Sequence, residues 1–93
     1  MAAPSALPCY RLSPEALIQR IGEETVFLQL ASEGYYLLDD VGSHMLSVLL
    51  ERQDRERAIA QLTGEYGVDP IQVHDDFMRI IDCLITAGLL VEE

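Results

Sequence analysis

Two isolated histidines and two pairs of adjacent aspartates are the residues of this chain that most resemble chemical machinery. His44 and His74 each stand alone in their segment, whereas a metal site needs several ligands at fixed spacing. The aspartate pairs, at positions 39–40 and 75–76, would supply an acid and a base only if their carboxylates faced one another. Adjacent residues on a helix do not, so helix capping or solvation explains both pairs better. We expect no metal, no cofactor and no catalytic residue.

The two cysteines give no stronger indication of chemistry. Cys9 and Cys83 lie far apart in the sequence and form no CxxC motif and no metal-ligand spacing. We interpret Cys83 as a reduced thiol in the core and Cys9 as incidental. The sequence also contains no GxSxG, Walker or HExxH motif. These observations predict that the protein is not an enzyme.

Length and charge restrict the partners of the chain. Its 93 residues, 49% of them hydrophobic, suit one globular domain. The formal net charge of -10 disfavours nucleic acid and anionic lipid and favours cationic or neutral partners. No apolar run approaches the roughly 20 residues of a membrane span, and the N-terminus lacks the pattern of a signal peptide. We therefore predict a cytoplasmic protein that binds neither nucleic acid nor membrane.

Three short segments rich in β-branched and aromatic residues, 16–21, 25–30 and 35–38, are separated by turn signals. They predict an antiparallel three-stranded meander in which Tyr36 and Leu38 share one face. Residues 1–9, with two prolines among small residues, are interpreted as a flexible tail. Residues 10–93 then form a single domain.

Three helices are predicted after the strands. Asp39 or Asp40 caps the first, which ends near Arg52; Asp54 caps the second, which ends at Gly67. Asp69 caps the third, with Pro70 at its first position and Gly88 after its end, where Leu89 packs on Leu84. The residues expected to face inward on the first two helices are Val41, Met45, Val48, Leu49, Ile59, Leu62 and Tyr66. This order of elements predicts an α+β, winged helix-turn-helix-like fold.

The apolar band of the third helix is wider than one core face needs. Val73, Phe77, Ile80 and Leu84 form the expected core stripe. One flank carries Gln72, Asp76, Arg79 and Cys83, and the other carries Met78, Ile81 and Ile85. One of these flanks could line a groove beside the third strand, which is a sheet edge. A peptide could add there as a fourth strand.

DNA binding is the competing interpretation, because a small sheet beside three helices can be a winged helix-turn-helix. The third helix would then enter the major groove. It carries Asp75, Asp76 and Asp82 against a single Arg79. The electrostatic contribution to DNA affinity would therefore have the wrong sign.

The segments "ETVFLQLASEGYYLLDDVGSHMLSVL" and "YGVDPIQVHDDFMRIIDCLITAGLL" resemble the PqqD-like family of peptide-recognition domains, also called RiPP recognition elements. The similarity extends over about residues 16–91. One departure is Met45 or Leu46 where an aromatic residue, often Trp, is common in the family. The resemblance implies a domain that binds the leader segment of a ribosomally synthesised precursor peptide, by strand addition to the third strand and contact with the third helix.

Carried over to this sequence, the resemblance implies a docking strand and one helix flank. The implied peptide-binding residues are Tyr35, Tyr36, Leu37, Leu38, Asp39, Gln72, Asp76, Arg79, Ile80 and Cys83. This flank is chosen because Asp76 matches a recurring acid of the family ahead of an apolar residue, here Phe77. The opposite flank stays open as an alternative.

A free-standing chain of this size is most similar to the leader-binding proteins of lasso peptide biosynthesis. That similarity implies two further partners, a leader peptidase resembling transglutaminase-like cysteine proteases and a cyclase. The alternatives are a PqqD-type chaperone that delivers its peptide to a radical enzyme, a winged-helix DNA-binding regulator and a subunit that only scaffolds a larger enzyme.

Overall fold

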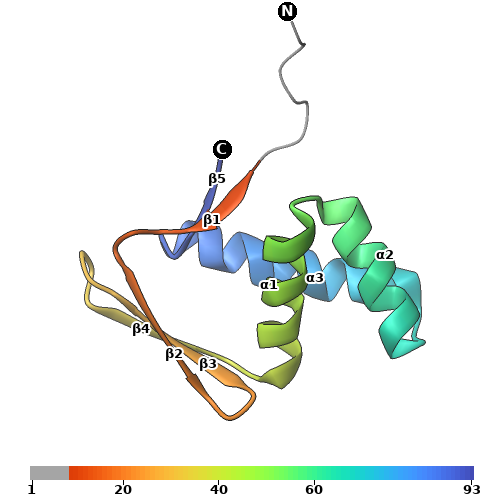
Figure 1. Cartoon of the computed structure of the whole chain (residues 1–93), viewed down its shortest axis with the longest axis horizontal. Helices are drawn as coiled ribbons and strands as arrows, with labels where there is room; N and C mark the ends of the chain where they lie inside the picture. Colours follow the sequence, from red (N-terminus) through yellow and green to blue (C-terminus); the bar gives the residue numbers. More distant parts are fainter. Residues whose placement is uncertain (1–8) are drawn as a thin grey trace, which may run out of the picture.

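The computed structural model describes residues 9–93 and shows a small sheet standing beside three helices (Figure 1). The predicted order of three strands followed by three helices is confirmed, with one short strand added before it and one after it. The elements are β1 (Tyr10–Leu12), β2 (Ala16–Ile21), β3 (Glu24–Gln29), β4 (Gly34–Leu38), α1 (Asp40–Arg52), α2 (Arg55–Tyr66), α3 (Pro70–Thr86) and β5 (Leu90–Glu92). The fold class is α+β, as predicted. Of the predicted tail at 1–9, residues 1–8 lie outside the described residues.

The strands β2, β3 and β4 form the expected antiparallel meander, in that spatial order. Phe27 of β3 lies opposite Tyr36 of β4, and Thr25 lies opposite Leu38. Because side chains alternate along a strand, these residues share the inner face, against the helices. Phe27 is fully buried there, whereas Tyr35 and Leu37 are exposed on the other face. The predicted alternation along the third strand is confirmed.

A second sheet, formed by β1 and β5, was missed by the sequence analysis. Tyr10 pairs with Glu92 and Leu12 with Leu90. Cys9, placed in the tail by the sequence analysis, exchanges two backbone hydrogen bonds with Glu93. Two strands of three residues, separated by most of the chain, carry no local pattern that would reveal their pairing.

Tyr10 and Arg55 tie the two ends of the chain to α2. Tyr10 is buried, and its hydroxyl donates to Glu92 (2.6 Å) while it accepts from Arg55 Nε (2.7 Å). Arg55 also contacts Glu92 through a second nitrogen (3.0 Å). Burial, followed by the hydrogen bond to Glu92, raises the pKa of Tyr10 above its usual value. The network therefore closes the fold by joining β1, β5 and α2.

The three predicted helix starts are confirmed, since the side chains of Asp39, Asp54 and Asp69 each accept backbone N–H groups of the turn that follows. Several side-chain positions differ from the prediction. Val41 and Tyr66 are partly exposed rather than inward, and on α3 the fully buried residue is Ile81, with Ile80 only half-buried. No helix within residues 9–93 is long and apolar enough to span a membrane.

The end of α3 is the predicted Schellman motif. Leu89 N donates to Leu84 O (3.0 Å) and Gly88 N donates to Ile85 O (3.1 Å). Gly88 has a φ of +76°, and a Cβ at this position would lie 2.9 Å from Nε2 of Gln29. That nitrogen donates to Gly88 O (3.0 Å). A glycine is therefore required both by the backbone and by the contact with β3.

We expect Gly88→Ala to lower the free energy of unfolding by about 2 kcal/mol, because it forces an L-residue into the left-handed region and displaces Gln29. Urea unfolding measures this change. Gly64→Ala is the matched control, since Gly64 lies in α2 with nothing near its Cβ position. There the same substitution should stabilise by about 0.5–1 kcal/mol. A neutral Gly88→Ala would contradict the assigned strain.

Candidate functional site

A groove of about 480 Å³ runs between β4 and α3. One wall is the end of the strand and the cap that follows it, formed by Tyr36, Leu37, Leu38 and Asp39. The other wall is α3, which contributes Arg79, Ile80, Cys83 and Leu84. We refer to these eight residues as the groove.

The strand wall is held in place by a direct join between β4 and α1. Asp39 Oδ1 accepts from Gly42 N (2.8 Å), so the residue that ends the strand also begins the helix. Ser43, in the first turn of α1, is buried and hydrogen-bonded to Thr25 of β3 (2.7 Å between hydroxyl oxygens). Gly42 leaves no spare room, because a Cβ there would lie 3.3 Å from the side chain of Leu38. The strand end is therefore fixed relative to the sheet and to α1.

The groove is mostly apolar, with one charged residue on each wall. Tyr36, Leu38 and Ile80 are half-buried against the core, so each keeps part of its surface free. Its two charged residues are Asp39, which is engaged as a helix cap, and Arg79. Arg79 pairs with Asp76 at 3.2 Å, but both side chains are exposed, and such a pair contributes little. The guanidinium is therefore free to exchange its partner.

The strand wall also presents backbone groups. β4 pairs with β3 on one side, and on its other side no strand of residues 9–93 follows. An edge of this kind carries N–H and C=O groups able to pair with another chain. The apolar groove lies directly beside this open edge. The arrangement suits an extended peptide that hydrogen-bonds to β4 and places every second side chain in the groove.

The structure brings together seven of the ten site residues inferred from the sequence: Tyr36, Leu37, Leu38, Asp39, Arg79, Ile80 and Cys83. It separates the other three. Tyr35 lies on the outer face of the sheet, while Gln72 and Asp76 line a different hollow with Val41 and Tyr66. Whether any of the ten contacts a peptide stays a prediction.

Two assignments change around the α3 wall. Cys83, expected as a core thiol, is exposed and lines the groove. Leu84 lines the groove although it had been assigned only to the core. Its position four residues after Ile80 could have indicated this, because i and i+4 lie on one face of a helix.

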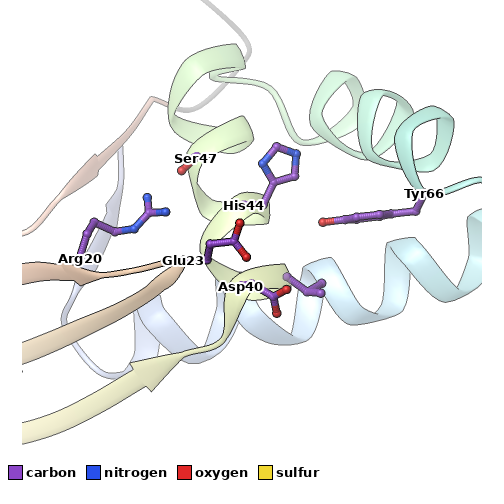
Figure 2. A pocket seen from close by; sticks show the side chains of 7 residues that line it. Arg20, Glu23, Asp40, His44, Ser47 and Tyr66 are labelled. Atoms are coloured by element: carbon purple, nitrogen blue, oxygen red, sulfur yellow. The ribbon is translucent and has the colours of Figure 1, made fainter.

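A second hollow, of about 300 Å³ and lined by several charged and polar side chains, lies between the β2–β3 hairpin, α1 and the end of α2 (Figure 2). Arg20 and Glu23 reach it from the hairpin, and Asp40, His44 and Tyr66 from the helices. It shares no lining residue with the groove. His44 Nε2 contacts Glu65 at 2.8 Å, and this hydrogen bond lowers the pKa of Glu65. Within residues 9–93 there is no cluster of three or more possible metal ligands.

Residues 24–90 match the family model described as coenzyme PQQ synthesis protein D (PqqD). The chain belongs to the PqqD family. The matched residues include β4 and α3, and so both walls of the groove; β1 and β2 precede the match. The resemblance inferred from the sequence is thereby confirmed.

Two solved structures are similar to this PqqD-family chain. One is TbiB1 in complex with the TbiA(beta) leader peptide, at 31% identity and a TM-score of 0.76, covering 86% of this chain and 93% of that one. The other is a lasso peptide synthetase B1 complexed with the leader peptide. It has 24% identity and a TM-score of 0.77, covers 88% of this chain and 96% of that one, and shows the shared fold alone. No curated protein matches the chain.

Proposed function

We propose that this protein binds the leader segment of a ribosomally synthesised precursor peptide by strand addition to β4, and presents it to a processing enzyme of the lasso-type leader peptidase class. The observation that carries the proposal is the open edge of β4 directly beside the apolar groove on α3. The relation to TbiB1, whose structure contains a leader peptide, supports it.

The energetics require both the edge and the groove. A micromolar complex needs about 8 kcal/mol. Each backbone hydrogen bond added to β4 contributes only about 1 kcal/mol net. Apolar leader side chains, enclosed between Tyr36, Leu38 and Ile80, add about 25 cal/mol for each Å² removed from water. Main-chain pairing then gives affinity with little sequence dependence, and the groove selects for apolar side chains at alternate positions.

Presenting the precursor to the processing enzyme means raising the local concentration of the precursor at that enzyme. A leader held on β4 keeps the attached precursor near whichever enzyme the protein contacts, which favours processing without any chemistry in this chain. The net charge of -10 steers a peptide that carries lysine or arginine toward the protein. The mechanism assigns recognition to this chain and bond cleavage to its partner.

A proline scan of the leader tests strand addition. Every second residue of an added strand directs its N–H toward β4, and proline lacks that donor. We expect affinity, measured by fluorescence polarisation, to fall about tenfold or more at alternate positions, with smaller effects between them. Alanine at the same positions is the control for side-chain loss, and duplex DNA is the control for nucleic-acid binding. Tolerance of proline throughout the leader would exclude strand addition.

The alternative is a PqqD-type chaperone that delivers a peptide to a radical enzyme. The description of the matching family model, coenzyme PQQ synthesis protein D, favours this reading. Competition between a lasso precursor leader and a precursor peptide of PQQ synthesis separates the two, because selectivity resides in the groove. Stronger binding of the second peptide would replace the lasso assignment and leave strand addition intact.

A further inference from the structure

The face of the sheet that points away from the helices is unusually apolar. Leu17 is 55% exposed, Ile21 56%, Tyr35 71% and Leu37 58%. Three of these residues, Leu17, Ile21 and Tyr35, line a hollow of about 460 Å³ together with Ile18, Gln19, Val26 and Leu28. Ile18 is not counted with them, because it lies opposite Phe27, on the other face of the sheet. We call the following seven residues the outer face: Leu17, Gln19, Ile21, Val26, Leu28, Tyr35 and Leu37.

Strand register places these side chains next to one another. Leu17 of β2 lies opposite Leu28 of β3, which lies opposite Tyr35 of β4; in the next row Val26 lies opposite Leu37. In an antiparallel sheet with one face on the core, the free face is normally polar. A contiguous apolar patch on it usually marks an interaction site, because exposure to water gives no stability.

Acidic residues border the outer face at both ends. Glu15 and Glu33 lie at the end where Ala16, Gln29 and Gly34 are paired, and Glu23 and Glu24 form the opposite turn. Arg20 is the one basic residue within β2, β3 and β4. The complementary surface therefore has an apolar centre and a border of lysine or arginine. A second copy of this chain, with the same net charge of -10, does not meet that description.

We propose that the outer face is the docking surface for the processing enzyme, which recognises it through an apolar patch with basic residues around it. This inference rests on the proposed function. Strand β4 is common to both surfaces, since Tyr35 and Leu37 point outward while Tyr36 and Leu38 face the helices, and Leu37 also borders the groove. In a leader strand added at β4, every second side chain would point to the same side of the sheet as the outer face and would enlarge it. An enzyme docked there would lie immediately beside the bound leader.

The double variant Leu17→Thr/Ile21→Thr tests the proposal. Both residues lie on β2, away from the groove, and threonine retains strand propensity. Its affinity for an inactivated leader peptidase, encoded with the same precursor, should fall at least about tenfold, with leader affinity unchanged within about twofold. Ile71→Thr is the matched control, because Ile71 is 69% exposed on α3 and should leave both affinities unchanged. Wild-type association should also weaken with salt.

Each other result overturns the inference. Peptidase binding that survives the double variant, or no peptidase binding by the wild type, removes the outer face as its docking surface. A homodimer in sedimentation that the double variant dissociates assigns the face to a second copy instead. Leader affinity is measured separately, on the isolated protein. If the proposed function is wrong, the isolated protein does not bind the leader, whether or not it binds the peptidase.

Discussion

Ile80→Asp is expected to weaken leader binding by at least about 100-fold. Ile80 lies on the α3 wall of the groove and Leu38 on the strand wall, and Ile80 is only partly buried, so part of its surface is free for a ligand. The substitution removes apolar contact and places a carboxylate where a bound peptide would exclude water. Loss of about 3 kcal/mol from these two causes corresponds to about two powers of ten in affinity. Fluorescence polarisation with a labelled leader measures the change.

Ile85→Asp is the matched control for this variant. It changes the same residue type, on the same helix, at another half-buried position that is not part of the groove. Both variants should lose stability to a similar degree, but only Ile80→Asp should lose leader affinity. Circular dichroism establishes that each protein is folded. Equal loss of leader binding in both variants would mean that affinity depends on stability rather than on the groove.

Phe77→Ala is expected to lower the free energy of unfolding by about 3–5 kcal/mol. Phe77 is fully buried at the centre of α3 and belongs to the core cluster that includes Phe27 of β3 and Leu49 of α1. Removing its ring leaves a cavity that the surrounding elements fill only in part. Domains of this size are commonly stable by about 5–15 kcal/mol, so the variant approaches the unfolding threshold. Urea denaturation measures the loss.

Two further substitutions calibrate that measurement. Phe77→Leu keeps most of the buried volume and should cost less than about half as much. Ile71→Ala, at an exposed site on the same helix, should change stability by less than about 0.5 kcal/mol. If Phe77→Ala cost no more than the change at Ile71, the core would not be organised around α3.

The sequence predicted the features of this fold that depend on local interactions. The caps at Asp39, Asp54 and Asp69 and the glycine after α3 were correctly assigned, because each satisfies backbone groups within one turn of its own position. The three-stranded meander was predicted for the same reason, since its turns and alternation are both short-range patterns. Membership of the PqqD family also followed from the order and spacing of such segments.

The pairing of β1 with β5 and the side of α3 that reaches the core were decided by tertiary structure. Measured from the mean direction of Val73, Phe77 and Leu84, at about 100° per residue, Ile80 deviates by about 40° and Ile81 by about 60°. Helical periodicity therefore slightly favours burial of Ile80, which is the wrong residue. The way α3 packs buries Ile81 and leaves Ile80 and Cys83 in the groove beside β4. It also places Gln72 and Asp76 in a separate hollow with α1 and α2. Burial depends on which neighbouring elements cover each face of a helix, and the helix's own sequence does not contain that information.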